Sequence, residues 1–313
     1  MDNLEEVHAG QDGWLFLNGG ANQPIRFYTE ENFLTLRHLN GWIERIENRG
    51  KSVQKLGAKY VHLFAPDKIS IYGDFYGKNL PFFDLRPNKV IHRALEKARL
   101  ADFFLDAELS LHRARQSALT YWKTDTHWTA EGTYSVYQSL CERLNVAPAF
   151  DLSERPSKES SSFGDLGNKL TPPVRETMRR YQIMQNAHRI YANALVEEGE
   201  KKEAHFPGGL LSGSHVVYRN ESSRAHKATL MLFGDSYSEV RPSNGLMTLL
   251  AETFQELHFF WSNSVDLRQV EKVRPDFVVS ELAERFARVL PDDPRDIEIY
   301  AAERLSKHLE TNR

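Results

Sequence analysis

The sequence predicts an α/β protein with a layered architecture built on a mainly parallel sheet. Runs of β-branched and aromatic residues alternate along the chain with stretches in which apolar residues recur at helical spacing. Strands that are separated by helices pair in parallel, and in open parallel sheets functional sites gather at the carboxyl ends of the strands. A hydrophobic content of 41% over 313 residues is enough for a substantial core.

The first half of the chain contains the clearest alternation of helix and strand. Apolar residues at helical spacing predict a long helix over residues 31–56, which ends at Gly57. An apolar run then predicts a buried strand over 59–65. Residues 88–100 are expected to form a helix and 101–105 a short strand. This succession is the main support for the layered architecture.

The segment that follows contains a helix start next to two polar residues of interest. Thr129 is a suitable N-cap for a helix that runs to about Leu144, because its hydroxyl can accept a hydrogen bond from the first turn. Asp125 and His127 are therefore expected on the loop just before that helix.

Residues 151–225 differ in composition from the rest of the chain. They are polar and interrupted by Pro, Gly and Ser, so we expect an insertion or elaborated lobe with some hairpin character inside a single domain, residues 1–313. The regular pattern returns after this segment, with strands expected over 228–233, 257–261 and 276–280 and helices over 241–254 and 282–290.

Composition excludes several classes of function. A formal net charge of −3 gives no electrostatic reason to expect a nucleic-acid partner. Cys141 is the one cysteine, so the chain has no internal disulfide and no thiolate metal cluster. No stretch approaches the 18 or so apolar residues of a membrane span. The N-terminal residues lack a basic head and an apolar stretch, so the chain as given shows no secretory signal, which leaves a cytoplasmic location open.

Asp125, His127 and Ser236 together offer an acid, a base and a nucleophile. A hydroxyl is a poor nucleophile at neutral pH, so an enzyme that uses one needs an imidazole to take its proton and a carboxylate to orient that imidazole. Ser236 follows a buried strand and Gly234 at an expected helix start, which would expose its side chain and direct backbone N–H groups at an oxyanion. These features predict a serine enzyme.

Each of these motifs has a simpler interpretation when it is taken alone. Asp235 or Ser236 can serve only as a helix cap, which is a common connection in α/β proteins. An Asp-x-His pair can be a hydrogen-bonded loop or supply metal ligands. The chain contains no His-Glu-x-x-His, no His-x-His and no Cys pair, so we expect no metal and no cofactor. The joint occurrence of the three residue types favours the catalytic interpretation.

Six blocks, in this order and over nearly the whole chain, resemble the SGNH hydrolase-like alginate O-acetyltransferase family. The Asp-x-His and Gly-x-Ser-x-Ser blocks are the specific ones, and the others mostly mark the scaffold. The blocks are DGWLFLNGG (12–20), FAPDKISIYGDFY (64–76), TDTHWTAEG (124–132), FGDLGNKL (163–170), FGDSYSE (233–239) and PDFVVSELAERF (275–286).

The resemblance implies a three-layer α/β/α SGNH hydrolase-like sandwich and an O-acetyltransferase that acts through an acetyl-serine. By that match Ser236 is the nucleophile, His127 the base and Asp125 its orienting partner. Ordinary SGNH esterases have these motifs in the reverse order and with one more residue between Asp and His, so the order here resembles the permuted acetyltransferase branch. The implied partners are an exopolysaccharide acceptor such as a polyuronate and an acetyl donor, or a membrane acyltransferase that delivers it. Family members usually act in the periplasm.

The resemblance leaves some roles open. The chain has no Gly-x-Asn-Asp block, so the Ser236 backbone N–H is the best oxyanion donor, with Asn244 and Arg241 as weaker candidates. Lys68 could contact an anionic sugar and Trp128 could stack on a sugar ring. The main alternative function is a carbohydrate acetyl esterase with the same triad, and the next is a catalytically silent polysaccharide-binding protein.

Two further side chains have structural expectations only. Glu281 and Arg285 lie one turn apart in the expected C-terminal helix and are expected to pair with each other. Trp14 is expected in the core.

Overall fold

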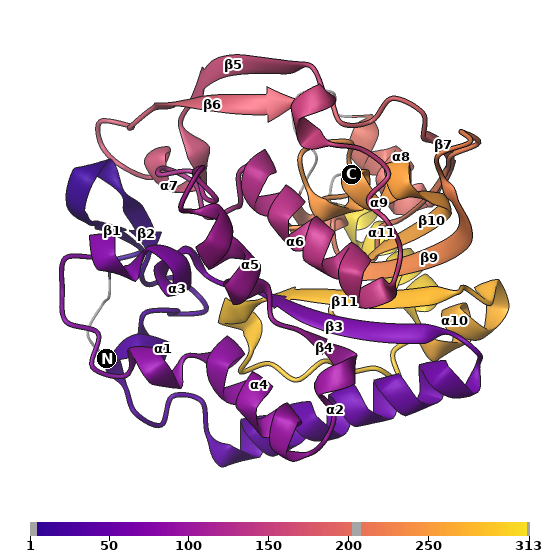
Figure 1. Ribbon diagram of the computed structural model, residues 1–313, viewed down its shortest axis with the longest axis horizontal. Coiled ribbons are helices and arrows are strands. Elements are labelled where there is room, and N and C mark those ends of the chain that lie inside the picture. Colours follow the sequence, from indigo (N-terminus) through magenta and orange to yellow (C-terminus); the bar gives the residue numbers. More distant parts are fainter. Residues whose placement is uncertain (1–4, 202–207, 312–313) are drawn as a thin grey trace.

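A seven-stranded mixed sheet forms the centre of the computed structural model, which describes residues 5–201 and 208–311 (Figure 1). The strand order is β4-β3-β11-β9-β10-β8-β7. The first five of these are mutually parallel, and β8 and β7 extend one edge with antiparallel pairing. The strands are β3 (Lys59–Ala65), β4 (Phe104–Leu105), β7 (His188–Ala192), β8 (His215–Arg219), β9 (His226–Gly234), β10 (Phe254–Trp261) and β11 (Phe277–Ala283). The expected mainly parallel sheet is confirmed.

Helices cover both faces of this sheet. Figure 1 shows α2 and α4 on one side of β3 and β11, and α5 and α6 on the other. The helices are α1 (Arg26–Thr29), α2 (Leu36–Lys55), α3 (Lys68–Tyr72), α4 (Pro87–Lys97), α5 (Ala107–Ala114), α6 (Ala130–Leu144), α7 (Gly164–Gly167), α8 (Ala194–Glu200), α9 (Leu246–Thr253), α10 (Leu267–Val273) and α11 (Ile297–Thr311). Among the described residues, no helix is both long and apolar enough to span a lipid bilayer.

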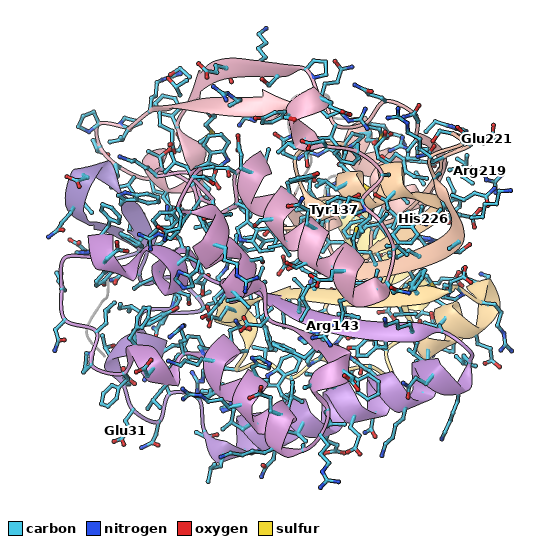
Figure 2. The ribbon with its side chains drawn as sticks, in the orientation of Figure 1. Glu31, Tyr137, Arg143, Arg219, Glu221 and His226 are labelled. Atoms are coloured by element: carbon cyan, nitrogen blue, oxygen red, sulfur yellow. The ribbon has the colours of Figure 1, made fainter. Side chains whose placement is uncertain are left out.

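The buried strands explain why the layers pack. In β3 every residue after Lys59 is buried, as expected for a strand covered on both faces. Tyr137 of α6, labelled in Figure 2, is fully buried, and its hydroxyl lies 2.7 Å from Thr253 Oγ1 at the end of α9. Trp14, which is 2% exposed and stacks on Tyr72, lies in the core as expected.

Most element boundaries lie within a few residues of the expected ones, but one element is of the wrong type. The expected strand over 276–280 continues to Ala283, because it stays paired with β3 as far as the Ala283–Ala65 pair. The expected helix over 282–290 is instead a short 3-10 turn, η7 (Glu284–Phe286). Glu281 therefore lies in a strand. It does not pair with Arg285, which binds Asp67 at 2.9 Å.

Residues 151–225 contribute to two parts of the molecule. The strands β5 (Ser157–Ser162) and β6 (Glu176–Tyr181) form an antiparallel pair outside the central sheet, at the top of Figure 1. Later in the same segment, β7 and β8 join the edge of the central sheet. The description of this segment as an insertion within one domain stays a prediction. The remaining small sheet pairs β1 (Val7–Ala9) with β2 (Leu15–Leu17).

Candidate active site

The turn that carries Ser236 lies at the carboxyl end of the central parallel strands. β9 ends at Gly234, and Ser236 is partly exposed two residues later. A side chain at position 234 would not fit, because a Cβ there would lie 2.5 Å from Ser238 Oγ and 2.9 Å from Glu281 Oε2. A larger residue there would have to displace the buried side chains of Ser238 and Glu281.

The loop that carries His127 is held mainly through its backbone. The Lys68 ammonium donates hydrogen bonds to the carbonyls of Trp122, Lys123 and Asp125 at 2.9, 2.9 and 2.7 Å. From β6, the carboxylate of Glu176 accepts hydrogen bonds from the backbone N–H groups at positions 123 and 124. A buried lysine therefore gathers three carbonyls on one side of the loop, and a carboxylate binds the N–H groups on the other.

Two further contacts join this loop to the rest of the site. Thr129 caps α6 as expected, accepting a hydrogen bond from Gly132 N at 3.0 Å. Tyr237, the residue after Ser236, donates its hydroxyl hydrogen to Thr126 O at 2.9 Å. The loop and the serine turn are thus connected directly, although they are more than 100 residues apart in the sequence.

The structure brings the three residues of the predicted triad within hydrogen-bond distance. His127 Nε2 lies 2.8 Å from Ser236 Oγ, and His127 Nδ1 lies 2.7 Å from Asp125 Oδ1. Asp125 Oδ1 also accepts a hydrogen bond from His127 N, and Oδ2 accepts one from Asp165 N. A carboxylate at Nδ1 favours the tautomer in which Nδ1 carries the proton, so Nε2 can accept the hydroxyl hydrogen of Ser236.

Asp165 is a member of the site that the sequence interpretation missed. Its carboxylate accepts hydrogen bonds from Thr126 N at 2.7 Å and Thr126 Oγ1 at 2.5 Å, and its Oδ2 lies 4.0 Å from His127 Nδ1. The residue before it, Gly164, has φ +63°, and a Cβ there would lie 2.3 Å from Thr124 O. The block FGDLGNKL that contains both was assigned to the scaffold, and its Gly-Asp pair was the available signal.

Burial is the largest single influence on the charge state of the Asp–His pair, but hydrogen bonds and charges together outweigh it. Burial by itself raises the pKa of Asp125, but the hydrogen bonds and charge of His127 outweigh it and lower that pKa overall. Burial likewise lowers the pKa of His127, but its hydrogen bond to Asp125 and the charges of Asp125 and Asp165 outweigh burial and raise it above the ordinary histidine value. Both shifts stabilise an imidazolium beside a carboxylate, the state that forms when the base takes a proton.

The same three residues could in principle hold a cation. Asp125, His127 and Asp165 each offer a ligand atom within 4.8 Å of the others. However, both oxygens of each carboxylate already accept hydrogens from N–H or O–H groups, and His127 Nε2 faces Ser236 Oγ. This hydrogen-bond pattern fits an acid–base relay better than a ligand set.

The expected substrate contacts of Lys68 and Trp128 need correction. Lys68 is 4% exposed and its ammonium is engaged with three carbonyls, so it positions the histidine loop and does not reach solvent. Burial lowers its pKa to about 7. Trp128 is 5% exposed, donates its indole hydrogen to Tyr121 Oη and packs against the Tyr237 ring at 4.7 Å. Little of its ring face is left for a sugar.

Asn244 and Arg241, the weaker oxyanion candidates, lie after the serine turn. The Asn244 amide is bound at both ends to the backbone of Tyr181, accepting from its N–H at 3.0 Å and donating to its carbonyl at 2.8 Å. It therefore connects β6 to the site, and one of its two amide hydrogens is held by the Tyr181 carbonyl. Arg241 is exposed and lies 3.4 Å from the Glu239 carboxylate.

Ser236 lies between two cavities. The first, of about 530 Å³, is lined by the triad side chains together with Trp128, Met178, Arg180 and Tyr181. The second, of about 290 Å³, is lined by Ser236, Asn263, Trp261, Arg295 and Tyr300. Among the described residues, His127 belongs to the lining of the first cavity and not to that of the second. A group that enters through the first cavity therefore meets both Ser236 and His127.

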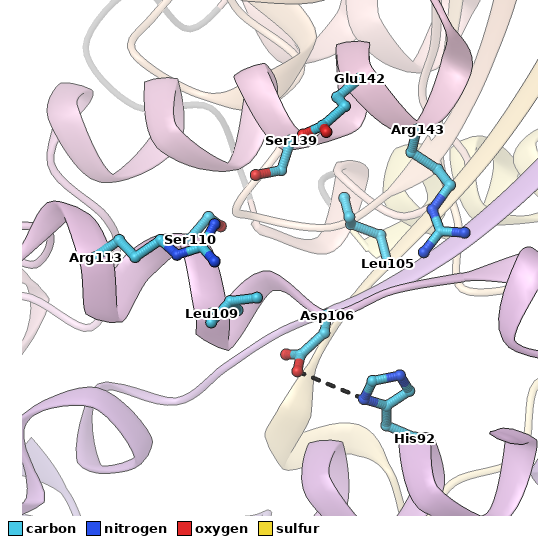
Figure 3. A pocket seen from close by; sticks show the side chains of 9 residues that line it. All are labelled: His92, Leu105, Asp106, Leu109, Ser110, Arg113, Ser139, Glu142 and Arg143. Carbon is cyan, nitrogen blue, oxygen red and sulfur yellow. Dashed lines mark ion pairs between the residues drawn. The ribbon is translucent and has the colours of Figure 1, made fainter.

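Another cavity of about 530 Å³ lies far from the triad, beside β4 and between α4, α5 and α6 (Figure 3). Its histidine, His92, pairs with Asp106 at 3.5 Å, and this hydrogen bond raises the pKa of His92. Ser110 donates its hydroxyl hydrogen to the carbonyl of Ala107. The described contacts thus give this cavity no serine paired with a base, and the chemistry is assigned to the Ser236 site.

The chain is similar to a family of known proteins. The family described as SGNH hydrolase-like domain, acetyltransferase AlgX, matches residues 7–209, about two thirds of the chain. The match includes Asp125 and His127 and ends before Ser236. The SGNH hydrolase-like α/β fold is thereby confirmed.

Individual proteins are also similar to this chain. The chain is 26% identical over 241 residues to the probable alginate O-acetylase AlgJ of Pseudomonas aeruginosa, covering 74% of this chain and 55% of that protein. It therefore spans about half the length of that curated relative. Among solved structures, the O-acetyltransferase domain of Pseudomonas putida AlgJ superposes with a TM-score of 0.57 at 17% identity, covering 96% and 99% of the two chains. Bacillus cereus PatB1 with a sulfonyl adduct superposes with 0.65 at 13% identity, covering 95% and 99%.

Proposed function

Because the chain belongs to the SGNH hydrolase-like acetyltransferase AlgX family, we propose that it transfers acetyl groups to hydroxyls of a polysaccharide through an acetyl-serine at Ser236. The observation that carries the proposal is the continuous hydrogen-bond relay from Ser236 Oγ through His127 to Asp125. Such a relay supplies what a serine hydroxyl lacks as a nucleophile at neutral pH.

In the first half-reaction Ser236 Oγ attacks the carbonyl carbon of the acetyl donor while its hydrogen passes to His127 Nε2. The tetrahedral intermediate collapses, the bond from the carbonyl carbon to the leaving oxygen breaks, and that oxygen takes the proton from Nε2. Asp125 stabilises the imidazolium formed between these steps. The backbone N–H of Ser236 is the proposed donor to the intermediate's oxyanion.

In the second half-reaction a sugar hydroxyl gives its proton to His127 Nε2 and attacks the acetyl-serine. The ester bond to Ser236 Oγ breaks, and Oγ recovers a proton from Nε2. Because His127 lines the first cavity, the sugar hydroxyl reacts there, beside Arg180 and Tyr181 of β6. The second cavity leaves room next to Ser236 for parts of a substrate that do not exchange a proton with the base.

The acceptor class is inferred from chemistry and from the relatives together. A similar protein is named as an alginate O-acetylase, and alginate is a polyuronate. Arg180 in the first cavity and Arg295 in the second place one guanidinium on each side of the nucleophile, which suits an acceptor that carries carboxylates. We therefore propose a polyuronate acceptor, with the acetyl group supplied by a donor ester or by a donor-delivering acyltransferase.

Transfer is tested directly by mass spectrometry. The protein is incubated with a chromogenic acetyl ester alone and with polyuronate or neutral oligosaccharides. We expect slow hydrolysis alone, an intact-mass increase of one acetyl group on Ser236, and acetylated product with a polyuronate, because a bound hydroxyl gains effective molarity over water. Fast hydrolysis, no acetylated sugar and ready deacetylation of acetylated glycans would show an esterase instead. Absence of any acetyl adduct and turnover would favour a silent binding protein.

A further inference from the structure

A buried carboxyl group on β11 holds the serine turn from behind. Glu281 Oε2 accepts a hydrogen bond from Asp235 N at 3.1 Å and another from Ser238 Oγ at 2.8 Å. These donors lie on either side of Ser236 in the sequence. A second bond from the same strand runs from Ala283 N to Asp235 Oδ2 at 2.8 Å. The position of Ser236 therefore depends on β11, although no atom of that strand belongs to the triad.

The surroundings of Glu281 do not suit a carboxylate anion. Its side chain is 1% exposed, and no described residue provides a hydrogen-bond partner for its Oε1. From the serine turn, Asp235 and Ser238 face it. From η7, the cation of Arg285 is directed at Asp67, which it binds at 2.9 Å. The charge that acts on Glu281 is that of Asp235, which has the same sign.

These surroundings favour the neutral acid. Burial, followed by the charge of Asp235, raises the pKa of Glu281 well above its usual range. A protonated Glu281 can still accept the hydrogen bonds of the serine turn and avoids two adjacent negative charges.

Resting on the proposed function, we propose that Glu281 is a positioning residue: as a neutral acid it fixes the turn 234–238 and so places Ser236 Oγ at His127. It touches no substrate and acts through the backbone at Asp235 and the hydroxyl of Ser238. Loss of its proton at alkaline pH puts a second negative charge beside Asp235 and loosens the turn. The reactivity of Ser236 therefore has an alkaline limit in addition to the acid limit imposed by His127.

Two substitutions separate the hydrogen bonds of Glu281 from its charge. Glu281→Gln keeps an oxygen acceptor, adds a donor and cannot ionise. Glu281→Met keeps a similar volume but removes both functions. We expect the Gln variant to react at neutral pH within about threefold of wild type and to lose the alkaline decline, and the Met variant to react roughly ten- to a hundredfold more slowly, as misplacement of a reacting group does.

Glu284 provides the matched control. It is as buried as Glu281 and three residues away, but it accepts hydrogen bonds from Asp67 N, Ser70 Oγ and Asn88 N, which lie outside the serine turn. Glu284→Gln and Glu284→Met therefore make the same chemical changes without touching the turn, and we expect both to leave the rate per folded molecule within about threefold of wild type.

The measurement is the pH dependence of the rate constant for modification of Ser236 by phenylmethylsulfonyl fluoride, followed by intact mass. The rate constant reports how reactive the Ser236 hydroxyl is, and it can be measured without acetyl transfer. A wild type that is sulfonylated but never transfers acetyl would refute the proposed function and leave this inference testable.

Thermal unfolding of each variant accompanies the rates. Since the folded pKa of Glu281 is raised, its ionisation opposes folding above the unfolded value, and Glu281→Gln should raise Tm more at pH 8 than at pH 5. Should Glu281→Met not fold, Ser238→Ala removes one of the two turn contacts with little change in volume, and it should slow sulfonylation about threefold to tenfold.

Three results would overturn the inference. The first is an equal loss of rate in the Glu281→Met and Glu284→Met variants. The second is a Gln variant as slow as the Met variant at neutral pH. The third is an alkaline profile that is the same in wild type and in Glu281→Gln.

Discussion

The two sides of Ser236 are built differently. On the sheet side, buried groups such as Glu281, Ser238 and Asp235 hold the nucleophile with several hydrogen bonds from β11. On the other side, the β5–β6 pair presents a mostly exposed surface that meets the site through Arg180 and Tyr181. The nucleophile is thus held where water is excluded, while the first cavity borders an exposed surface. Changes on the sheet side should therefore alter chemistry, and changes on the β6 side should alter the choice of acceptor.

The largest effect should come from the nucleophile itself. Ser236→Ala removes the atom that would carry the acetyl group, and we expect turnover of an activated acetyl ester to fall by about four to six orders of magnitude. The hydroxyl is partly exposed and contributes little to packing, so Tm should change by no more than a few degrees. Near-normal turnover in a folded variant would remove Ser236 from the mechanism.

The second largest effect should come from Asp125→Asn, which tests whether turnover depends on the orientation of the His127 imidazole. An amide at Nδ1 favours the wrong tautomer, so we expect turnover to fall by about three to four orders of magnitude without unfolding. The neighbouring carboxylate offers a control: Asp165→Asn leaves the Asp125 contact in place and should cost much less. If chelators inhibited the wild type and a divalent ion restored it, the pair would be a ligand set instead.

The pH profile measures the charge balance of the Asp125–His127 pair. His127 must be neutral to accept the serine hydrogen, and its pKa is raised by Asp125 and Asp165. The rate should therefore rise with pH through a midpoint above the ordinary histidine value of about 6.5, falling about tenfold per pH unit below it. The remaining activity of Asp125→Asn should show a lower midpoint. A wild-type profile that is flat from about pH 5 to 8 would count against an imidazole base.

Lys68→Met should have an intermediate effect, because Lys68 is buried but contacts only backbone carbonyls of the loop that carries His127. Removing the ammonium leaves three carbonyls of the histidine loop without their common donor. We expect kcat for a small ester to fall roughly ten- to a hundredfold, as it does when a reacting group shifts slightly. Lys158→Met, at an exposed residue of β5, is the control and should leave kcat unchanged. An increase in KM for a polyuronate with unchanged kcat would restore Lys68 to a role in binding.

The smallest effect should come from the β6 side. Arg180→Gln removes an exposed cation from the first cavity, and we expect the yield of acetylated polyuronate relative to hydrolysis to fall about threefold to fivefold. Because an exposed charge is screened, added salt should reduce the difference between wild type and variant. Equal losses with neutral and acidic acceptors would show that Arg180 does not recognise a carboxylate.

Local sequence determined much of this protein. The strand at 59–65, the Thr129 cap and the placement of Ser236 after a buried strand follow from hydrophobic period, capping and turn chemistry, each of which acts over a few residues. The Asp-x-His and Gly-Asp-Ser blocks were recognisable for the same reason. The residues around each block already indicate that its side chains lie at the end of a helix or strand.

Only the tertiary structure decided how distant segments use one another. Glu281 was expected on a helix beside Arg285, but pairing with β3 extends β11 and directs Glu281 to the serine turn. Lys68 was expected to contact an anionic sugar, yet its ammonium is buried among the carbonyls of a loop more than 50 residues away. Asp165 lies in a block that was interpreted as scaffold, and only the folded chain places its carboxylate against Thr126. These contacts depend on strand register and on which buried polar groups need partners, and both are settled only when the whole core is packed.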